Sequence, residues 1–197
     1  MKTKLSIVLF AAILGACNNS TNDAKKDAEK VNGNNIDTSK MDYANASVAR
    51  NDADFLVFAA DVGSFEVKAG QLAAANSHDG KVKDFAAMMV KDHTAMGNDV
   101  NNLAAKEHVT LPTDLSNPLK AEWNKLDSLK GEKFDKEYAD FNVKGHEEAI
   151  SKFKQVADSG SNYSMDVKQL AIAALPKLQE HKEHSDMLKS EVVAERK

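Results

Sequence analysis

Four ionisable side chains fall on apolar stripes of the sequence, at positions where a core hydrophobe is expected. They are Glu66, His93, His146 and His181. In the stretch VKDFAAMMVKDH, for example, His93 follows Met89 by four residues and precedes Met96 by three, the spacing of one buried helix face. Imidazole and carboxylate groups are common transition-metal ligands. Because four segments each contribute one such group, we expect them to meet in one buried polar site.

Apolar residues recurring every three or four positions predict four long helices, at residues 52–76, 81–103, 132–157 and 164–193. Counted from the turn between the first two helices, Glu66 and His93 lie within ~4 Å of each other along the axis at 1.5 Å per residue. His146 and His181 differ by about five residues, or ~7 Å. A kink at Pro176 or a longer loop must absorb that offset.

The connection between the second and third long helices is too long for a simple hairpin. It contains Pro112 and Pro118 and a predicted short helix at residues 117–130. A parallel placement of the two helices would need a return path of ~35 Å, which such a segment covers. The sequence therefore predicts an all-α four-helix bundle with one long crossover between helices 2 and 3.

Other residues near the four ionisable groups have simpler interpretations. Gly63, Gly97 and Gly145 lie close to these groups, and each costs roughly 0.5–1 kcal/mol in a helix interior. They therefore predict a tight approach of the helices around this layer. We expect Asp92 to be solvated.

The N-terminus has the features of a secretory signal. Two lysines precede a short apolar run, and LGAC ends in Cys17, the single cysteine of the chain. This stretch resembles the lipobox of bacterial lipoproteins, in which the cysteine is lipidated. The alternative is an ordinary signal peptide with an incidental cysteine. We predict a signal peptide at 1–16, a flexible polar tether at 17–51 and the folded domain at 52–197.

The net charge and the number of cysteines limit the classes of molecule to which this protein can bind or be linked. Without residues 1–16, the chain has 24 basic and 30 acidic residues, a balance that disfavours nucleic acid. A single cysteine excludes an internal disulfide. Lipid on Cys17 is the expected membrane attachment, since no other segment is apolar enough to span a bilayer.

Four motifs together resemble a known family. The stretches FEVKAGQLA, VKDFAAMMVKDH, FDKEYADFNVKGHEEAI and LPKLQEH are similar to domain-of-unknown-function family 4142. The resemblance covers roughly residues 52–192. It implies a ferritin-like four-helix bundle and a place in the bacterial cell envelope, with the outer membrane favoured. It marks the same four ionisable residues as polar core positions and implies no activity.

A carboxylate-rich di-iron site is not expected, because the Glu-x-x-His pairs of such sites are missing. The residues three positions before the histidines are Val90, Val143 and Leu178. What remains is a mononuclear set of three histidines and Glu66, suited to Zn, Cu, Mn or Fe. The alternative is a metal-free hydrogen-bond network built on Glu66.

Two classes of function follow from a metal site. The favoured one is a lipid-anchored envelope protein that binds a metal ion without catalysis, in a stress-related role. The other is a mononuclear metalloenzyme, an oxidase or a superoxide-handling protein, that uses an open position on the metal.

The lipoprotein interpretation predicts that Cys17→Ser abolishes lipidation, because the lipid would be attached to the cysteine sulfur. Mass spectrometry of the mature N-terminus measures this directly. An unmodified Cys17 in the wild-type protein would refute the interpretation.

Overall fold

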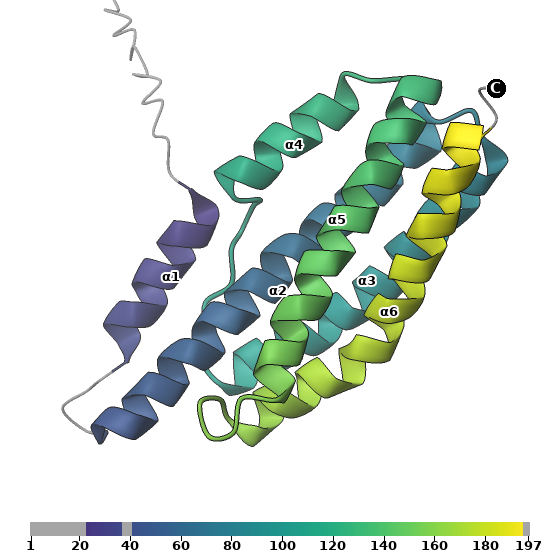
Figure 1. Ribbon diagram of the computed structural model, residues 1–197. Coiled ribbons are helices and arrows are strands. Elements are labelled where there is room, and N and C mark those ends of the chain that lie inside the picture. Colours follow the sequence, from purple (N-terminus) through teal and green to yellow (C-terminus); the bar gives the residue numbers. More distant parts are fainter. Residues whose placement is uncertain (1–22, 37–40, 195–197) are drawn as a thin grey trace, which may run out of the picture.

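The computed structural model describes residues 23–36 and 41–194, and this part of the chain contains helices and no strands (Figure 1). The helices are α1 (Ala24–Asn35), α2 (Tyr43–Asn76), α3 (Gly80–Lys106), α4 (Asn117–Asp127), α5 (Glu132–Ala157) and α6 (Met165–Ala194). The all-α prediction is confirmed. The predicted signal peptide and Cys17 lie outside the described residues. No described helix combines the length and the apolar character needed to cross a membrane.

The predicted flexible tether is in part helical, which corrects the expected domain boundary. Helix α1 lies within residues 17–51, and α2 begins at Tyr43 rather than near residue 52. The Asn32 side chain exchanges two hydrogen bonds with the Thr110 backbone, at 2.9 and 2.7 Å. Asp23 caps α1 and also accepts a hydrogen bond from the Asn117 backbone N–H at 3.1 Å. These polar contacts hold α1 in place, and an argument from apolar composition does not detect them.

The long helices α2 and α3 form an antiparallel hairpin, and α5 and α6 form a second one (Figure 1). The Gly131 N–H donates to the Asn76 carbonyl at 2.8 Å, so α5 starts at the end of the molecule where α2 ends and α3 starts. Residues 107–131, which include α4, therefore carry the chain back along the full length of α3.

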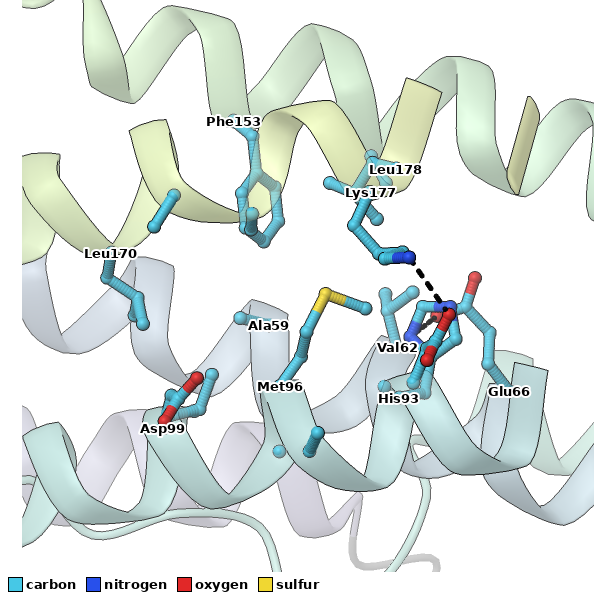
Figure 2. Close-up of a pocket in the computed structure, with 18 residues that line it drawn as sticks. Ala59, Val62, Glu66, His93, Met96, Asp99, Phe153, Leu170, Lys177 and Leu178 are labelled. Carbon is cyan, nitrogen blue, oxygen red and sulfur yellow. Dashed lines mark ion pairs between the residues drawn. The ribbon is translucent and has the colours of Figure 1, made fainter. Parts of the chain in front are cut away.

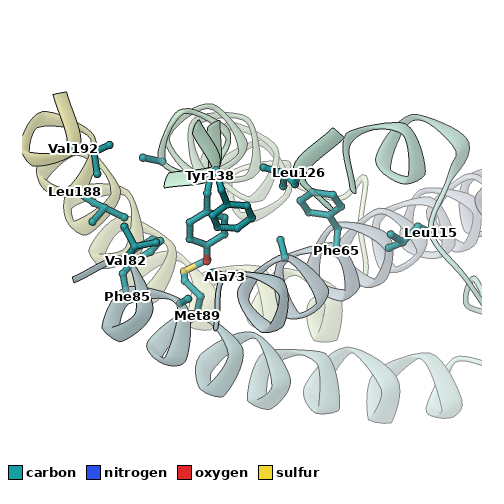
Figure 3. Packing of buried hydrophobic residues seen from close by; sticks show 14 residues of the cluster. Phe65, Ala73, Val82, Phe85, Met89, Leu115, Leu126, Tyr138, Leu188 and Val192 are labelled. Atoms are coloured by element: carbon teal, nitrogen blue, oxygen red, sulfur yellow. The ribbon is translucent and has the colours of Figure 1, made fainter. Parts of the chain in front are cut away.

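The buried apolar residues form two clusters. The first, which we call the Phe65 cluster, contains Val82 and Met89 of α3 together with residues of α2, α5 and α6 (Figure 3). The second, the Phe55 cluster, contains Val100 and Ala104 of α3. Along α3, α5 and α6, a histidine lies between the residues of one cluster and those of the other, and on α2 Glu66 directly follows Phe65 at the edge of the Phe65 cluster. The core is thus two apolar halves with a polar layer between them.

The closest described approach at a glycine is between α2 and α3 at Gly70. A Cβ atom there would lie 2.7 Å from Cγ2 of Val90 and 3.0 Å from the Ala86 carbonyl oxygen. Backbone oxygen has no room to move aside inside a packed helix pair. A side chain at this position therefore forces α2 and α3 to shift apart.

The glycines near the polar layer do not mark tight packing, so that prediction is wrong. At Gly63 and Gly97 a Cβ would meet no described atom within 4 Å beyond the neighbouring backbone of its own helix. At Gly145 it would make an ordinary contact of 3.6 Å with the Phe141 ring. The helices leave open space beside Gly63 and Gly97.

We predict opposite effects of alanine at two of these glycines. Gly97→Ala should raise the free energy of unfolding by about 0.5–1 kcal/mol, because alanine favours the helix and meets no clash. Gly70→Ala should lower it by about 1–3 kcal/mol through overpacking. Urea unfolding of both variants measures the two signs, and a stabilising Gly70→Ala would show that the α2–α3 contact is looser than described.

Candidate metal centre

The structure brings together the four ionisable residues singled out in the sequence. Glu66 of α2, His93 of α3, His146 of α5 and His181 of α6 are each at most 4% exposed. The three imidazole rings have centroid separations of 5.7, 5.0 and 5.4 Å. The offset counted between α5 and α6 is therefore absorbed. Helix α6 continues through Pro176 and changes direction along its length (Figure 1).

Each histidine is held through one ring nitrogen by an acceptor. Nδ1 of His93 lies 2.9 Å from Oε2 of Glu66. Nδ1 of His146 lies 2.8 Å from the carbonyl oxygen of Asn142, one helical turn earlier. Nε2 of His181 lies 3.1 Å from Oδ2 of Asp92. Carbonyl and carboxylate oxygens only accept, so these three ring nitrogens carry the hydrogens, and in a neutral ring the other nitrogen offers a lone pair.

Those remaining nitrogens are buried. Nε2 of His93, Nε2 of His146 and Nδ1 of His181 have no hydrogen-bond partner among the described residues. One ring nitrogen from each histidine lies within 4.8 Å of one from each of the others. A tetrahedral ion with metal–nitrogen bonds of about 2.0–2.1 Å requires ligand nitrogens ~3.4 Å apart. The rings therefore reach a metal-binding geometry by closing on the order of 1 Å.

Glu66 adds a further acceptor at the centre. Its Oε1 is buried without a hydrogen-bond partner in the described part of the chain, and it lies 3.6 Å from Nε2 of His146. That separation is too long for a hydrogen bond. Glu66 therefore accepts a hydrogen bond from His93 through Oε2, and its other oxygen, Oε1, has no hydrogen-bond partner among the described residues.

The electrostatics keep two of the rings neutral. Burial lowers the pKa of His146, and it lowers the pKa of His181 to about 4, because a desolvated imidazolium is disfavoured. Burial also opposes the Glu66 carboxylate, but the charge and hydrogen bond of His93 outweigh it, so its pKa is lowered overall. Neutral imidazoles at His146 and His181, beside an ionised carboxylate, are protonation states that metal ligation requires.

Asp92 belongs to the site, contrary to the expectation that it is solvated. Its Oδ2 contacts His181 and lies 3.4 Å from Nζ of Lys177. Burial disfavours its ionised form, yet the hydrogen bond from His181 and the charge of Lys177 lower its pKa overall. Asp92 directly precedes His93, so it sits about 100° around α3 and faces α6. In the sequence, the one indication that Asp92 belongs to the site is its position next to His93. Many acidic residues on protein surfaces also neighbour a buried residue, so this indication is weak.

A cavity of about 220 Å³ adjoins this centre (Figure 2). Its wall includes Glu66, His93 and the Asp92–Lys177 ion pair. The rest of the lining is mainly apolar and small. The three-histidine centre therefore borders a space large enough for a small molecule.

Comparison with known proteins identifies one match. The sequence model of a family described as Domain of unknown function (DUF4142) matches residues 37–188. Neither the curated proteins nor the solved structures gave a match. The matched range starts before α2 and contains all four ionisable residues.

The lowered pKa of His181 predicts how the free energy of unfolding of the metal-free protein changes as the pH falls. Its folded pKa is about 4, against ~6.5 in the unfolded chain. As the pH falls from ~6.5 towards 4, only the unfolded chain gains this proton, so stability present above ~6.5 is progressively lost. His181→Asn should reduce the pH slope of the unfolding free energy by about one proton in this window. Urea unfolding with a chelator measures the slope; an unchanged slope would mean that folded His181 is protonated.

Proposed function

Since the chain belongs to the Domain of unknown function (DUF4142) family, whose description names no activity, we propose a function from the site itself. The protein binds one transition-metal ion through Nε2 of His93, Nε2 of His146 and Nδ1 of His181. Its role is binding rather than catalysis.

The observation that carries this proposal is the group of three buried histidines with ring nitrogens within 4.8 Å of one another, each of which also has an unpartnered ring nitrogen. A buried polar atom without a partner costs about 1–3 kcal/mol, and a metal-free network leaves all three in that state. One ion satisfies the three together. The contacts behind the rings support the same conclusion, because metal-binding histidines donate their other nitrogen to a carboxylate or carbonyl. Glu66, Asp92 and the Asn142 carbonyl provide those acceptors.

The chemistry of the donors limits the ion. Imidazole nitrogens suit Zn, Cu, Mn and Fe. Such an ion supplies concentrated positive charge and Lewis acidity when it is bound. Glu66 holds His93 in place through Oε2, and its Oε1 is the remaining acceptor at the centre.

The proposal extends to the fold and the location. We assign α2, α3, α5 and α6 to a ferritin-like four-helix bundle in which α4 belongs to the crossover. The LGAC sequence supports attachment through lipid on Cys17 to a membrane of the bacterial envelope, with the outer membrane favoured and a stress-related role. Membrane lipid is the one partner proposed.

A second candidate function is a mononuclear metalloenzyme, an oxidase or a superoxide-handling protein. Two observations favour it specifically. Three protein ligands leave a coordination position open, as in catalytic zinc sites. The cavity also reaches His93, one of the three proposed ligands.

Metal titration of untagged, chelator-treated protein tests the centre. We expect one equivalent of Zn²⁺ or Cu²⁺ to bind at pH 7.5 and to stabilise the fold by about 2.7 kcal/mol at 100 times Kd. His93→Ala, His146→Ala and His181→Ala should each abolish this stabilisation. Asp92→Asn should weaken binding by about 10–100-fold, because it replaces the charged acceptor that orients His181 by a neutral amide.

His184→Ala is the matched control, because His184 is on the same helix as His181 and outside the three-histidine group. It should leave metal affinity unchanged. Glu66→Gln separates two roles for Glu66: a loss of about 10–100-fold indicates orientation of His93, and a loss as large as that of His93→Ala indicates direct ligation. If metal adds no stability, or adds as much to His93→Ala, the metal-free network is the correct description.

A further inference from the structure

The cavity beside the centre has charged side chains at both ends and an apolar body between them (Figure 2). Glu66, His93 and Lys177 lie at one end of the view, and Asp99 and Leu170 lie at the other. Between them the wall is formed by apolar side chains, among them Ala59, Met96 and Phe153. A molecule that fills this space therefore needs a mainly apolar body, and a polar group on it finds partners at an end of the cavity.

Two glycines keep the space open. Gly63 of α2 and Gly97 of α3 both line the cavity, and no described side chain approaches the Cβ position of either one. Each lies in a helix interior, where glycine is less favourable than alanine. Close packing of helices does not explain them, in contrast to Gly70. What Gly63 and Gly97 contribute is the open volume of the cavity itself.

The size of the cavity indicates the size of the ligand. An engineered protein cavity of about 150 Å³ lined by apolar side chains holds one benzene molecule. The volume here is about 220 Å³, which accommodates one aromatic ring with a small substituent. Ala95, Asp99 and Ala173 of the lining are solvent-exposed, so such a molecule has a route in from the surface.

The charges around the cavity decide the nature of the polar group. Three carboxylates line it, those of Glu66, Asp92 and Asp99, against one ammonium group, that of Lys177. That ammonium group is already paired with Asp92 at 3.4 Å and with Glu180 at 2.8 Å. An anionic ligand would face net repulsion. A group that donates a hydrogen bond instead finds the buried Glu66 carboxylate, whose Oε1 has no partner among the described residues.

We infer that this cavity is a binding site for a small phenol. The aromatic ring occupies the apolar body beside Gly63 and Gly97, and the hydroxyl donates to the Glu66 carboxylate. The inference goes beyond the proposed metal binding and does not require it, because Oε1 of Glu66 has no partner among the described residues of the metal-free protein.

Three probes of matched shape test the inference on metal-free wild-type protein, by ligand-observed NMR and calorimetry. They are p-cresol, toluene, which lacks the hydroxyl, and p-toluate, which is an anion. We expect p-cresol to bind at least about 10-fold more tightly than toluene and p-toluate not to bind. Failure of p-cresol to bind, or tighter binding of p-toluate, would overturn the inference.

Variants locate the site. Gly97→Leu should fill the cavity and weaken both p-cresol and toluene at least about 10-fold. Gly33→Leu is the matched control, because Gly33 lies in α1 away from the cavity and a Cβ there also meets nothing within 4 Å. It should leave binding unchanged. Gly63→Leu replaces Gly97→Leu if the latter does not unfold cooperatively. Undiminished p-cresol binding in a folded cavity-filling variant would refute this location.

Glu66→Gln tests the polar contact. It should remove most of the preference for p-cresol over toluene and leave toluene binding unchanged, because the ring site is intact. An unchanged preference would assign the hydroxyl to another acceptor and overturn the inference as stated. Metal titration is a separate measurement. If the protein binds p-cresol but no metal, the proposed function is refuted and the phenol site is not.

Discussion

A layer of ionisable side chains crosses the core between two apolar clusters, and the rest of the structure depends on how this layer is satisfied. Burial of Glu66, His93, His146 and His181 is costly unless every polar atom finds a partner. One ring nitrogen of each histidine has such a partner. The other ring nitrogen of each histidine needs a partner, and no described side chain provides one. A bound ion is the simplest group that can serve as that partner.

The same contacts fix the arrangement of the helices. Glu66 and His93 join α2 to α3, and Asp92 and His181 join α3 to α6. A one-residue shift of either pair along the axis would separate the partners by about 1.5 Å and turn the side chains by about 100°. The apolar clusters on both sides tolerate exchange of similar hydrophobes, whereas these directional contacts do not. These directional contacts therefore fix the register of α2, α3 and α6 relative to one another.

Glycine has two different uses in this fold. At Gly70 it allows the backbones of α2 and α3 to approach closely, and any side chain would collide with Ala86 and Val90. At Gly63 and Gly97 it leaves space that the cavity occupies. The first use stabilises the hairpin, and the second costs helix stability and maintains a cavity beside the candidate metal centre.

The sequence by itself determined the long helices and the buried position of four ionisable residues, because the period of the apolar residues defines each helix face. It did not determine how helices distant in the chain are offset along their axes. The offset decides that His146 and His181 share a layer with His93, and that Asp92 reaches His181. It also decides whether a glycine meets a neighbour or open space, and whether α1 finds the backbone of Thr110. These features depend on distances between separate segments, and a one-dimensional pattern of residue types does not contain such distances.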